Sequence, residues 1–263
     1  MGRDRFFDLL REYKLLVRKR KPRVFTTQSK HRFRRYPNLA KDFIPMKAHE
    51  LWVADITYIP LKHRFAYLFL ITDAYSRKIV GFHLSDDMKV SSAAVALRKA
   101  LHQKPPETIV MHHSDRGLQY CSTDYVNLLQ QHHVLISMTE NGDPYENAIA
   151  ERVNGILKTE LISSYYPNFD KAAAHILRAI TIYNHHRRHT SLNWQVPEDV
   201  HQQQGPQIKR WKNYWVPETR INRNKSEKGP SHKTFSLAVK GTENVFSHAP
   251  ASPIINQDQD EIP

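Results

Sequence analysis

Hydrophobic positions in the middle of the chain follow two patterns that predict most of its secondary structure. Short apolar blocks rich in β-branched residues are typical of strands, and apolar residues three and four positions apart indicate helices. Strands are predicted at 50–60, 65–73, 77–84, 108–112 and 134–137, and helices at 91–103, 123–132, 146–163 and 169–188. Three consecutive strands followed by alternating helices and strands predict an α/β fold, a mixed sheet flanked by helices.

The two ends of the chain lack this regular order. Residues 4–18 have the apolar spacing of an amphipathic helix, and a basic stretch containing Pro, Phe and Tyr follows them. Beyond residue 204 the sequence is polar and basic with little apolar periodicity, so we expect a poorly ordered, largely disordered tail. The predicted organisation is a basic N-terminal helical arm (1–48), a core (49–204) and a C-terminal extension (205–263).

Charge separates the arm from the core. The chain has a formal net charge of +13. Residues 1–50 carry 15 Lys/Arg against 5 Asp/Glu, whereas residues 51–204 carry 15 of each. A basic arm on a neutral core is typical of proteins that bind the phosphate backbone of nucleic acids. Arg32, Arg34 and Arg35 are the predicted phosphate contacts in the arm; a flexible, solvated basic tail is the alternative.

Other classes of protein fit poorly. The single cysteine, Cys121, allows no disulfide within the chain. The N-terminus lacks the apolar core of a signal peptide, and no apolar run is long enough to span a membrane. The expected location is the cytoplasm, without a membrane partner.

Three acidic residues in separate segments suggest the chemistry. Asp55 lies in the predicted strand WVADITYIP, Asp115 follows the strand TIVMHH, and Glu151 lies in a predicted helix. Carboxylates brought together from two strands and a helix could hold two Mg²⁺ ions, which activate the attacking oxygen and stabilise the leaving oxygen in phosphodiester chemistry. Each Asp alone could equally be a structural turn residue, so the hypothesis rests on the three together.

The helix around Glu151 has one polar face. Asn147, Glu151, Asn154 and Lys158 recur at helical spacing, so they share that face. If Glu151 meets the metal ions, Lys158 would face substrate DNA two turns further on, and Asn147 and Asn154 are predicted contacts beside it. A solvated lysine is the alternative for Lys158.

Five sequence words occur in the order that a known family shows. They are LWVADITYI, YLFLITDAYSRKIVGFHLSDDM, HHSDRGLQYCS, SMTENGDPYENAIAERVNGILKTEL and YNHHRRHTSLNWQVPEDV. In these words the chain closely resembles the integrase-core transposases of bacterial insertion sequences, the DDE enzymes related to retroviral integrases. Within them it is most similar to the catalytic product of the second reading frame (OrfB type). The resemblance runs from about residue 20 to about residue 200.

The resemblance implies a fold, an activity and partners. The fold would be ribonuclease H-like, and Asp55, Asp115 and Glu151 would bind Mg²⁺, for which Mn²⁺ can substitute. The activity would be metal-dependent 3′-end cleavage and strand transfer on double-stranded DNA, both element ends and target. Expected partners are further copies of the chain on DNA and an upstream helix-turn-helix protein of the same element. The arm itself would be a remnant of a helix-turn-helix-like region.

Some positions leave alternatives open. Arg116, Gln119 and Tyr120 follow Asp115 and are predicted to touch DNA near it. Glu146 stands where the family usually has Asp, and Arg188 where it usually has Pro. In the same terminal word, Arg187 and His189 could cap and pack a helix or contact DNA.

Two other functions remain as rivals. The first is a nuclease on the same fold that cuts DNA without joining it. The second is an inactive DNA-binding remnant of a decayed element, which the presence of all three carboxylates disfavours.

Overall fold

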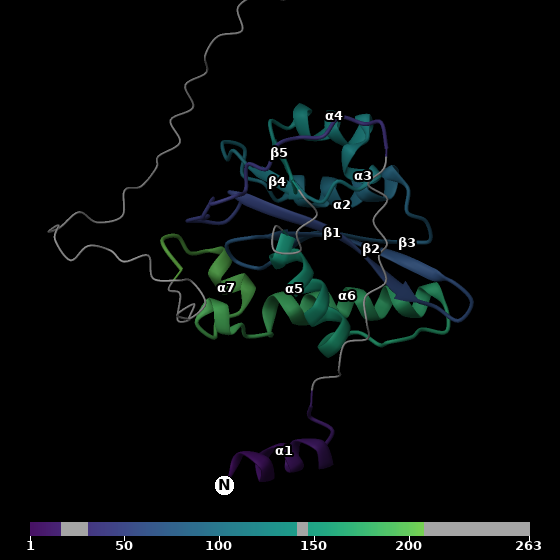
Figure 1. The fold of residues 1–263 in the computed structure, drawn as a ribbon, viewed down its shortest axis with the longest axis vertical. Coiled ribbons are helices and arrows are strands. Elements are labelled where there is room, and N and C mark those ends of the chain that lie inside the picture. Colours follow the sequence, from purple (N-terminus) through teal and green to yellow (C-terminus); the bar gives the residue numbers. More distant parts are fainter. Residues whose placement is uncertain (17–30, 141–146, 208–263) are drawn as a thin grey trace, which may run out of the picture. The chain divides into compact units, whose positions relative to one another are not determined.

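A computed structural model describes residues 1–16, 31–140 and 147–207, and within these ranges the core is a mixed five-stranded sheet (Figure 1). The strand order is β3-β2-β1-β4-β5. β1 pairs antiparallel with β2, and β2 with β3, whereas β1–β4 and β4–β5 are parallel. The strands are β1 (Leu51–Pro60), β2 (Phe65–Asp73), β3 (Ile79–Ser85), β4 (Met111–Ser114) and β5 (Leu135–Met138). The predicted mixed sheet is confirmed.

Helices cover both faces of this sheet. Figure 1 shows α2 (Val90–His102), α3 (Leu118–Cys121) and α4 (Thr123–Gln131) on one face. It shows α5 (Ala148–Ile156), α6 (Phe169–His185) and α7 (Pro197–His201) on the other. A short 3₁₀ turn, η3 (Thr190–Leu192), joins α6 to α7, and α1 (Arg3–Glu12) comes before the core in the chain.

The alternation of side chains along β1 decides which layer each residue meets. Trp52 and Ala54 are fully buried in the cluster that contains residues of α2, α3 and α4. Ile59, of the opposite parity, packs with residues of α5 and α6. Because successive side chains of a strand point to opposite faces, Asp55 lies on the face that α5 and α6 cover.

The predicted long helix 146–163 is divided. It begins as α5 and continues as a π-helical segment, η2 (Leu157–Leu161). The amide of Ile162 donates to the carbonyl of Leu157, five residues back, over 2.9 Å. Thr159 adds a 2.8 Å bond from its hydroxyl to the carbonyl of Gly155. Apolar spacing predicts helix here but cannot distinguish an α from a π turn.

Other boundaries shift by a few residues. β3 begins at Ile79 because the residues before it form a turn, in which Arg77 has a φ of 65°. β4 begins at Met111 and not at 108, and α3 is a one-turn helix that apolar spacing does not reveal. At the N-terminus, α1 ends at Glu12, and residues 17–18 of the predicted helix lie outside the described residues.

A segment that we call the N-terminal strap (residues 31–47) lies against the core. Ser137 Oγ of β5 accepts the amides of Leu39 and Ala40 at 2.9 and 3.1 Å. The amide of Met138 donates to the carbonyl of Pro37 over 3.2 Å. The strap is therefore attached along the β5 edge of the sheet.

Parts of the predicted organisation cannot be compared with the structure. The structure does not describe residues 17–30 of the arm or residues 208–263 of the extension. The predicted boundaries at 48 and 204 stay predictions. In the ranges that are described, no helix is long and apolar enough to cross a membrane.

Candidate active site

The pairing of β1 with β4 brings two of the three predicted carboxylates to one place. The residue numbers of the paired positions differ by 60: Leu51 pairs with Met111, Trp52 with His112 and Val53 with His113. Continued by two residues, this register sets Asp115, just past the end of β4, beside Asp55. Adjacent strands lie ~4.8 Å apart, and residues of equal parity point to the same face. The 60 positions that separate Asp55 from Asp115 in the sequence thus correspond to the register of the two parallel strands.

A buried tyrosine supports this proximity. Burial raises the pKa of Tyr120 well above its usual value, and the charges of Tyr125, Asp115 and Asp55 raise it further, in that order. Both carboxylates therefore lie within electrostatic reach of the same phenol.

Asp55 is held by two donors. Its Oδ1 accepts the amide of Ile56 at 2.9 Å, and its Oδ2 accepts the side-chain amide of Asn154 at 2.6 Å. Asp55 is half-buried, whereas Asn154 is 6% exposed. A buried neutral donor of this kind fixes the orientation of a carboxylate without neutralising its charge.

Asp115 is held by the turn that follows it. Its Oδ1 accepts the amide of Gly117 at 2.9 Å. A Cβ added to Gly117 would itself lie 2.9 Å from that oxygen, so a larger residue would disturb the carboxylate. The carbonyl of Arg116, between them, lies 2.9 Å from His31 Nε2 in the strap. The strap therefore supports the same turn from outside.

Two asparagines attach α5 to β1 on either side of Glu151. Asn147 Nδ2 donates to the carbonyl of Ala54 at 2.9 Å, and Asn154 donates to Asp55 as described above. Glu151 lies four residues after the first and three before the second, on the same helix face. Glu151 is half-buried. The helix is thus fixed across β1 at the level of Asp55, with the third carboxylate between its two attachments.

The donor set fits a hard divalent cation, although the described residues do not form a closed site. Mg²⁺ prefers carboxylate and other oxygen ligands, which is what Asp55, Asp115 and Glu151 offer. The amide oxygens of Asn147 and Asn154 are buried nearby without a hydrogen-bond partner. Within the described ranges, however, no three His, Cys, Asp or Glu residues are grouped so that they could hold an ion.

Four of the residues predicted to contact DNA are buried. Asn147 and Asn154 join α5 to β1, and they are 7% and 6% exposed. Gln119 is 8% exposed and donates to the carbonyl of Met88 over 2.9 Å. Tyr120 is 3% exposed within the core cluster. In this conformation their side chains support the site from within, and their burial gives no support to direct DNA contact.

The basic residues predicted to contact DNA lie at the surface. Arg32, Arg34 and Arg35 are exposed on the strap, and the Arg34 guanidinium lies 5.1 Å from the centre of the Tyr36 ring. Lys158 is exposed on the π-helical segment, and Arg116 is half-buried.

Two arginines act on the same buried thiol as Asp115. Burial, together with the charge of Asp115, raises the pKa of the Cys121 thiol to about 11, while Arg35 and Arg116 oppose the rise. All three charges therefore act on the thiol of the last residue of α3. One arginine of the strap and the arginine next to Asp115 thus lie within electrostatic reach of the same thiol as Asp115.

Arg187 and His189 make structural contacts. The sequence left both helix packing and DNA contact open for these two residues. Arg187 forms a two-bond ion pair with Glu160 of η2, with N–O distances of 2.7 and 2.8 Å. His189 is 6% exposed and packs edge-on against Tyr183, with ring centres 5.1 Å apart. Both residues stabilise the junction of η2 with the end of α6.

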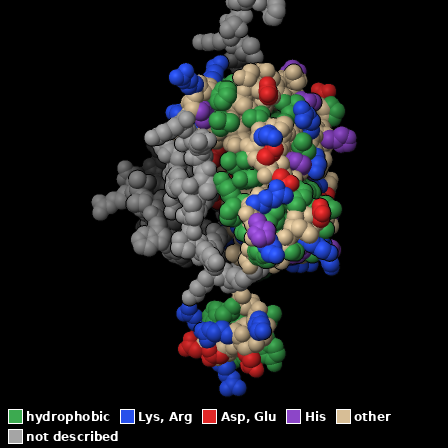
Figure 2. All heavy atoms as spheres, turned by 90° about the vertical axis from the view of Figure 1, so that its right-hand side faces the viewer, with side chains coloured by type: hydrophobic (Ala, Val, Ile, Leu, Met, Phe, Trp, Pro, Cys, Tyr) green, Lys and Arg blue, Asp and Glu red, His purple; other side chains and the backbone are tan. Residues whose placement is uncertain are grey.

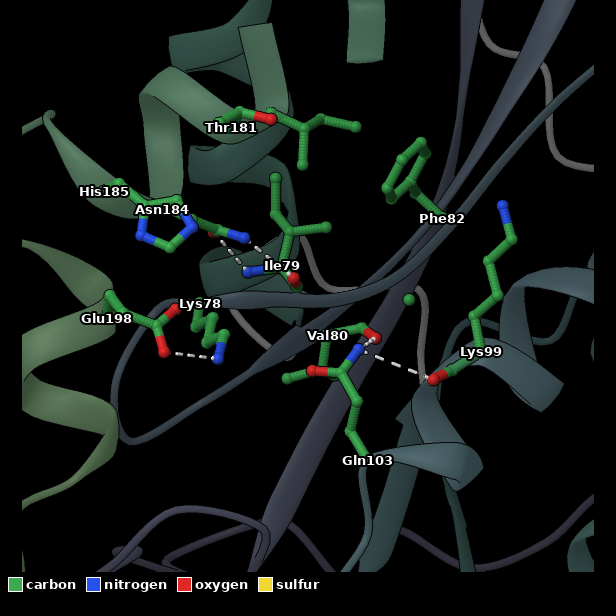
Figure 3. A pocket seen from close by; sticks show the side chains of 12 residues that line it. Lys78, Ile79, Val80, Phe82, Lys99, Gln103, Thr181, Asn184, His185 and Glu198 are labelled. Atoms are coloured by element: carbon green, nitrogen blue, oxygen red, sulfur yellow. Dashed lines mark hydrogen bonds and ion pairs between the residues drawn. The ribbon is translucent and has the colours of Figure 1, made fainter. Parts of the chain in front are cut away.

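A pocket of about 360 Å³ lies elsewhere, between β3, α2 and α6 (Figure 3). Lys78 and Glu198 form an ion pair of 2.8 Å at one end. Asn184 bonds both the amide and the carbonyl of Ile79, at 2.9 and 3.0 Å. None of the three predicted catalytic carboxylates lines this pocket.

Comparison with known proteins agrees with this arrangement. Two models of the integrase core domain match residues 45–144 and 132–197. An insertion element IS600 uncharacterized 31 kDa protein from Shigella sonnei is 37% identical over 195 residues, 73% of this chain and 72% of the relative. A putative transposase of insertion sequence element IS986/IS6110 from Mycobacterium tuberculosis is 35% identical over 152 residues, 55% of each chain.

The fold has a counterpart among solved structures. The simian T-cell lymphotropic virus intasome, solved in complex with PP2A regulatory subunit B56 gamma, contains a chain that matches 70% of this one. The match covers 66% of that chain at 19% identity and a TM-score of 0.53, and it bears on the fold alone. Together with the sequence relatives, the ribonuclease H-like arrangement places this chain in the integrase-core family of insertion-sequence DDE transposases, enzymes of DNA transposition within the retroviral integrase superfamily.

Proposed function

We propose that Asp55, Asp115 and Glu151 hold two Mg²⁺ ions, or Mn²⁺ in their place, and that this site catalyses 3′-end cleavage and strand transfer of an insertion sequence. The observation that carries the proposal is the attachment of α5 to β1. Asn147 and Asn154 bond Ala54 and Asp55 from either side of Glu151, while the β1–β4 register brings Asp115 alongside.

The residues of the chain would bind and orient, and none of them needs to act as a nucleophile. When bound, the ions supply Lewis-acid chemistry for attack on a phosphodiester and departure of the leaving oxygen. Asn154 fixes one oxygen of Asp55, and the amide of Gly117 fixes one oxygen of Asp115. The buried amide oxygens of Asn147 and Asn154 would accept hydrogen bonds from water in the loaded site.

Loading the site would require a small rearrangement. No group of three acidic or imidazole side chains in the described ranges is arranged to hold an ion. We therefore expect ions and DNA to draw Glu151 and Asp115 together, since catalytic contacts often tighten only in the complex with substrate.

DNA would be held by the strap and by cations near the site. Figure 2 shows one face of the core on which Lys/Arg and Asp/Glu side chains are interspersed, in keeping with its zero net charge. Arg32, Arg34 and Arg35 concentrate positive charge on the strap, and Arg116 and Lys158 would add contacts near the carboxylates. A homo-oligomer on DNA and an upstream helix-turn-helix protein of the same element complete the proposed assembly.

The strap contacts can be tested by the salt dependence of duplex binding. Replacing Arg32, Arg34 and Arg35 together by Ala should weaken binding to every duplex and reduce the log–log salt slope by up to ~3, because each phosphate contact contributes ~0.9. The control replaces three exposed cations on other elements, Lys62, Arg98 and Arg178. An unchanged slope in the strap variant would show that these arginines do not contact phosphates.

The activity is tested with labelled element-end DNA and Mg²⁺. We expect cleavage that leaves a 3′-OH, and joining when the ends are supplied pre-cut. Cleavage without joining of pre-cut ends would identify a nuclease, and neither activity would identify an inactive remnant. Asp55→Asn, Asp115→Asn and Glu151→Gln should each abolish cleavage and joining, because each removes a metal-ligand charge at nearly constant size. The control Asp124→Asn, at an exposed carboxylate on α4, should keep both activities.

A further inference from the structure

The turn between α6 and α7 displays a large aromatic side chain in an unusual backbone conformation. Trp194 is 57% exposed. Asn193 and Trp194 have φ values of 55° and 64°, two consecutive residues in the left-handed region. That region is uncommon for bulky residues and persists only where the surroundings enforce it, often at functional sites.

The surroundings of Trp194 do enforce it. Its amide donates to the carbonyl of His189 at 2.8 Å, and its carbonyl accepts from Arg188 Nη1 at 2.9 Å. The backbone carbonyl of the next residue, Gln195, accepts the amide of His189 at 3.0 Å. Below the turn, buried Leu192 packs with Tyr75 and Val200. The backbone is held by these contacts, and the Trp194 side chain is exposed.

Positive charge accompanies the indole. Arg188 and Arg152 are exposed, and among the described residues no carboxylate forms an ion pair with either of them. Burial, together with the charges of Arg187, Arg77 and Arg152, lowers the pKa of His189 to about 4, while Glu160 opposes the fall. Of these arginines, Arg187 is paired with Glu160, whereas Arg152 is exposed and directly follows Glu151 in α5.

We propose that Trp194 is a stacking platform for an unpaired base of the DNA, with Arg188 and Arg152 holding the adjoining phosphates. This inference rests on the proposed DNA-processing function. An aromatic face flanked by arginines is how proteins bind single-stranded nucleic acid, because every base offers a face for stacking and every phosphate a charge. Bases inside a duplex are already stacked on their neighbours, so the platform takes a base from a frayed or single-stranded end of the DNA.

The test compares two labelled DNAs, a flush duplex and the same duplex with a short unpaired 3′ tail, bound by the full chain without added metal so that the DNA stays uncut. Stacking contributes ~1–3 kcal/mol per base, so Trp194→Ala should weaken binding to the tailed DNA by roughly 5- to 150-fold. Binding to the flush duplex should change less than about twofold, and Trp194→Phe should retain most of the affinity. Tyr165→Ala, at another exposed aromatic residue (51%), should bind both DNAs as the wild type does.

A second variant excludes a merely structural role. Trp194→Gly should lose the preference for tailed DNA and yet melt at a higher temperature than Trp194→Ala, because glycine adopts positive φ without strain. Equal loss on both DNAs, no loss on either, or a lower melting temperature for Trp194→Gly would overturn the proposal. The proposal would also be overturned if the Trp194 variants bound DNA as the wild type does but no longer self-associated, because the indole would then belong to a protein interface.

The same preparations separate this inference from the proposed function. Suppose that the wild-type protein binds and cleaves DNA and that the Trp194 variants keep its preference for tailed DNA. That outcome overturns only the role of Trp194. Wild-type protein that binds no DNA overturns both.

Discussion

At the scale of single residues, the buried side-chain amide of Asn154 holds the carboxylate of Asp55 in place. Its side chain joins α5 to Asp55 Oδ2 over 2.6 Å, and it is almost inaccessible to solvent. Partners of this kind fix the orientation of a metal-binding side chain and so tune its affinity for the ion. We therefore treat Asn154 as a positioning residue.

Asn154→Ala should raise the Mg²⁺ concentration required for half-maximal cleavage and lower activity by roughly 10- to 100-fold at limiting Mg²⁺. Activity should recover in part as Mg²⁺ is increased, which loss of a purely structural contact would not produce. Asn127→Ala, at an exposed asparagine on α4, is the matched control. An unchanged Mg²⁺ requirement would show that Asn154 does not act through Asp55.

Sequence patterns identify the kinds of residue at the site better than their roles. The spacing of Asp55 and Asp115 indicates a shared site, and the β1–β4 register explains that spacing. Tyr120 was predicted to touch DNA but is buried among Tyr125 and other core residues. A run of polar residues after a strand indicates that a turn follows. It does not show which side chains of that turn face inward, because packing against α4 decides this.

At the scale of elements, the contact between β3 and α2 depends on the absence of a side chain. Gly81 lies so close to α2 that an added Cβ would overlap the carbonyl oxygen of Ala96 and lie 2.9 Å from the Cβ of Ala100. Helix and strand can approach this closely only with glycine at this position.

Gly81→Ala should lower the free energy of unfolding by about 1–3 kcal/mol, the usual cost of overpacking, because α2 must move away from the sheet. Urea denaturation measures the change. Gly2→Ala, where nothing lies within 4 Å of an added Cβ, should have no comparable effect. Wild-type stability of Gly81→Ala would contradict the close packing of α2 on β3.

Element types follow from periodicity, whereas their ends depend on single side chains. All five predicted strands appear, and helices form at the predicted places. The π-helical segment after α5 and the late start of β3 depend on particular contacts. In the second case Asp73 accepts the amide and the hydroxyl of Ser76 and so holds the turn before β3. The side-chain amide of Asn184, more than 100 residues away, then bonds both backbone groups of Ile79, the first residue of the strand. Local sequence carries no sign of such a partner.

At the scale of the whole molecule, buried histidines tie distant segments together. His49 and His201 face each other with their Nε2 atoms 3.1 Å apart, and His201 Nδ1 lies 2.9 Å from Ser76 Oγ. Ser76 also donates to buried Asp73, which accepts the amide of His49. This network joins the residues just before β1, the turn after β2, and α7.

These histidines should make stability depend on pH. Burial lowers the pKa of His49, His189 and His201 to about 4, and that of His112 to about 3. In the unfolded chain each would take up a proton near pH 6.5. Stability should therefore be fully present above about pH 6.5 and fall as the pH drops toward 4, with each histidine contributing up to ~1.4 kcal/mol per pH unit.

Urea unfolding between pH 7.5 and 4.5 measures this dependence. His201→Gln should flatten it by the share of one histidine, whereas His102→Gln, at an exposed position, should leave it unchanged. A free energy of unfolding that does not vary over this range would mean that the histidines are not buried as neutral groups.

The most direct test of the central claim is to locate the metal ions. A crystal of the full chain with element-end DNA and Mn²⁺ reveals them by anomalous scattering. We predict two peaks ~3.5–4 Å apart, contacted by carboxylate oxygens of Asp55, Asp115 and Glu151, with Asn154 still bonded to Asp55. Peaks at other residues, or an ordered DNA complex in which Glu151 points away from the ions, would contradict the assignment of the active site.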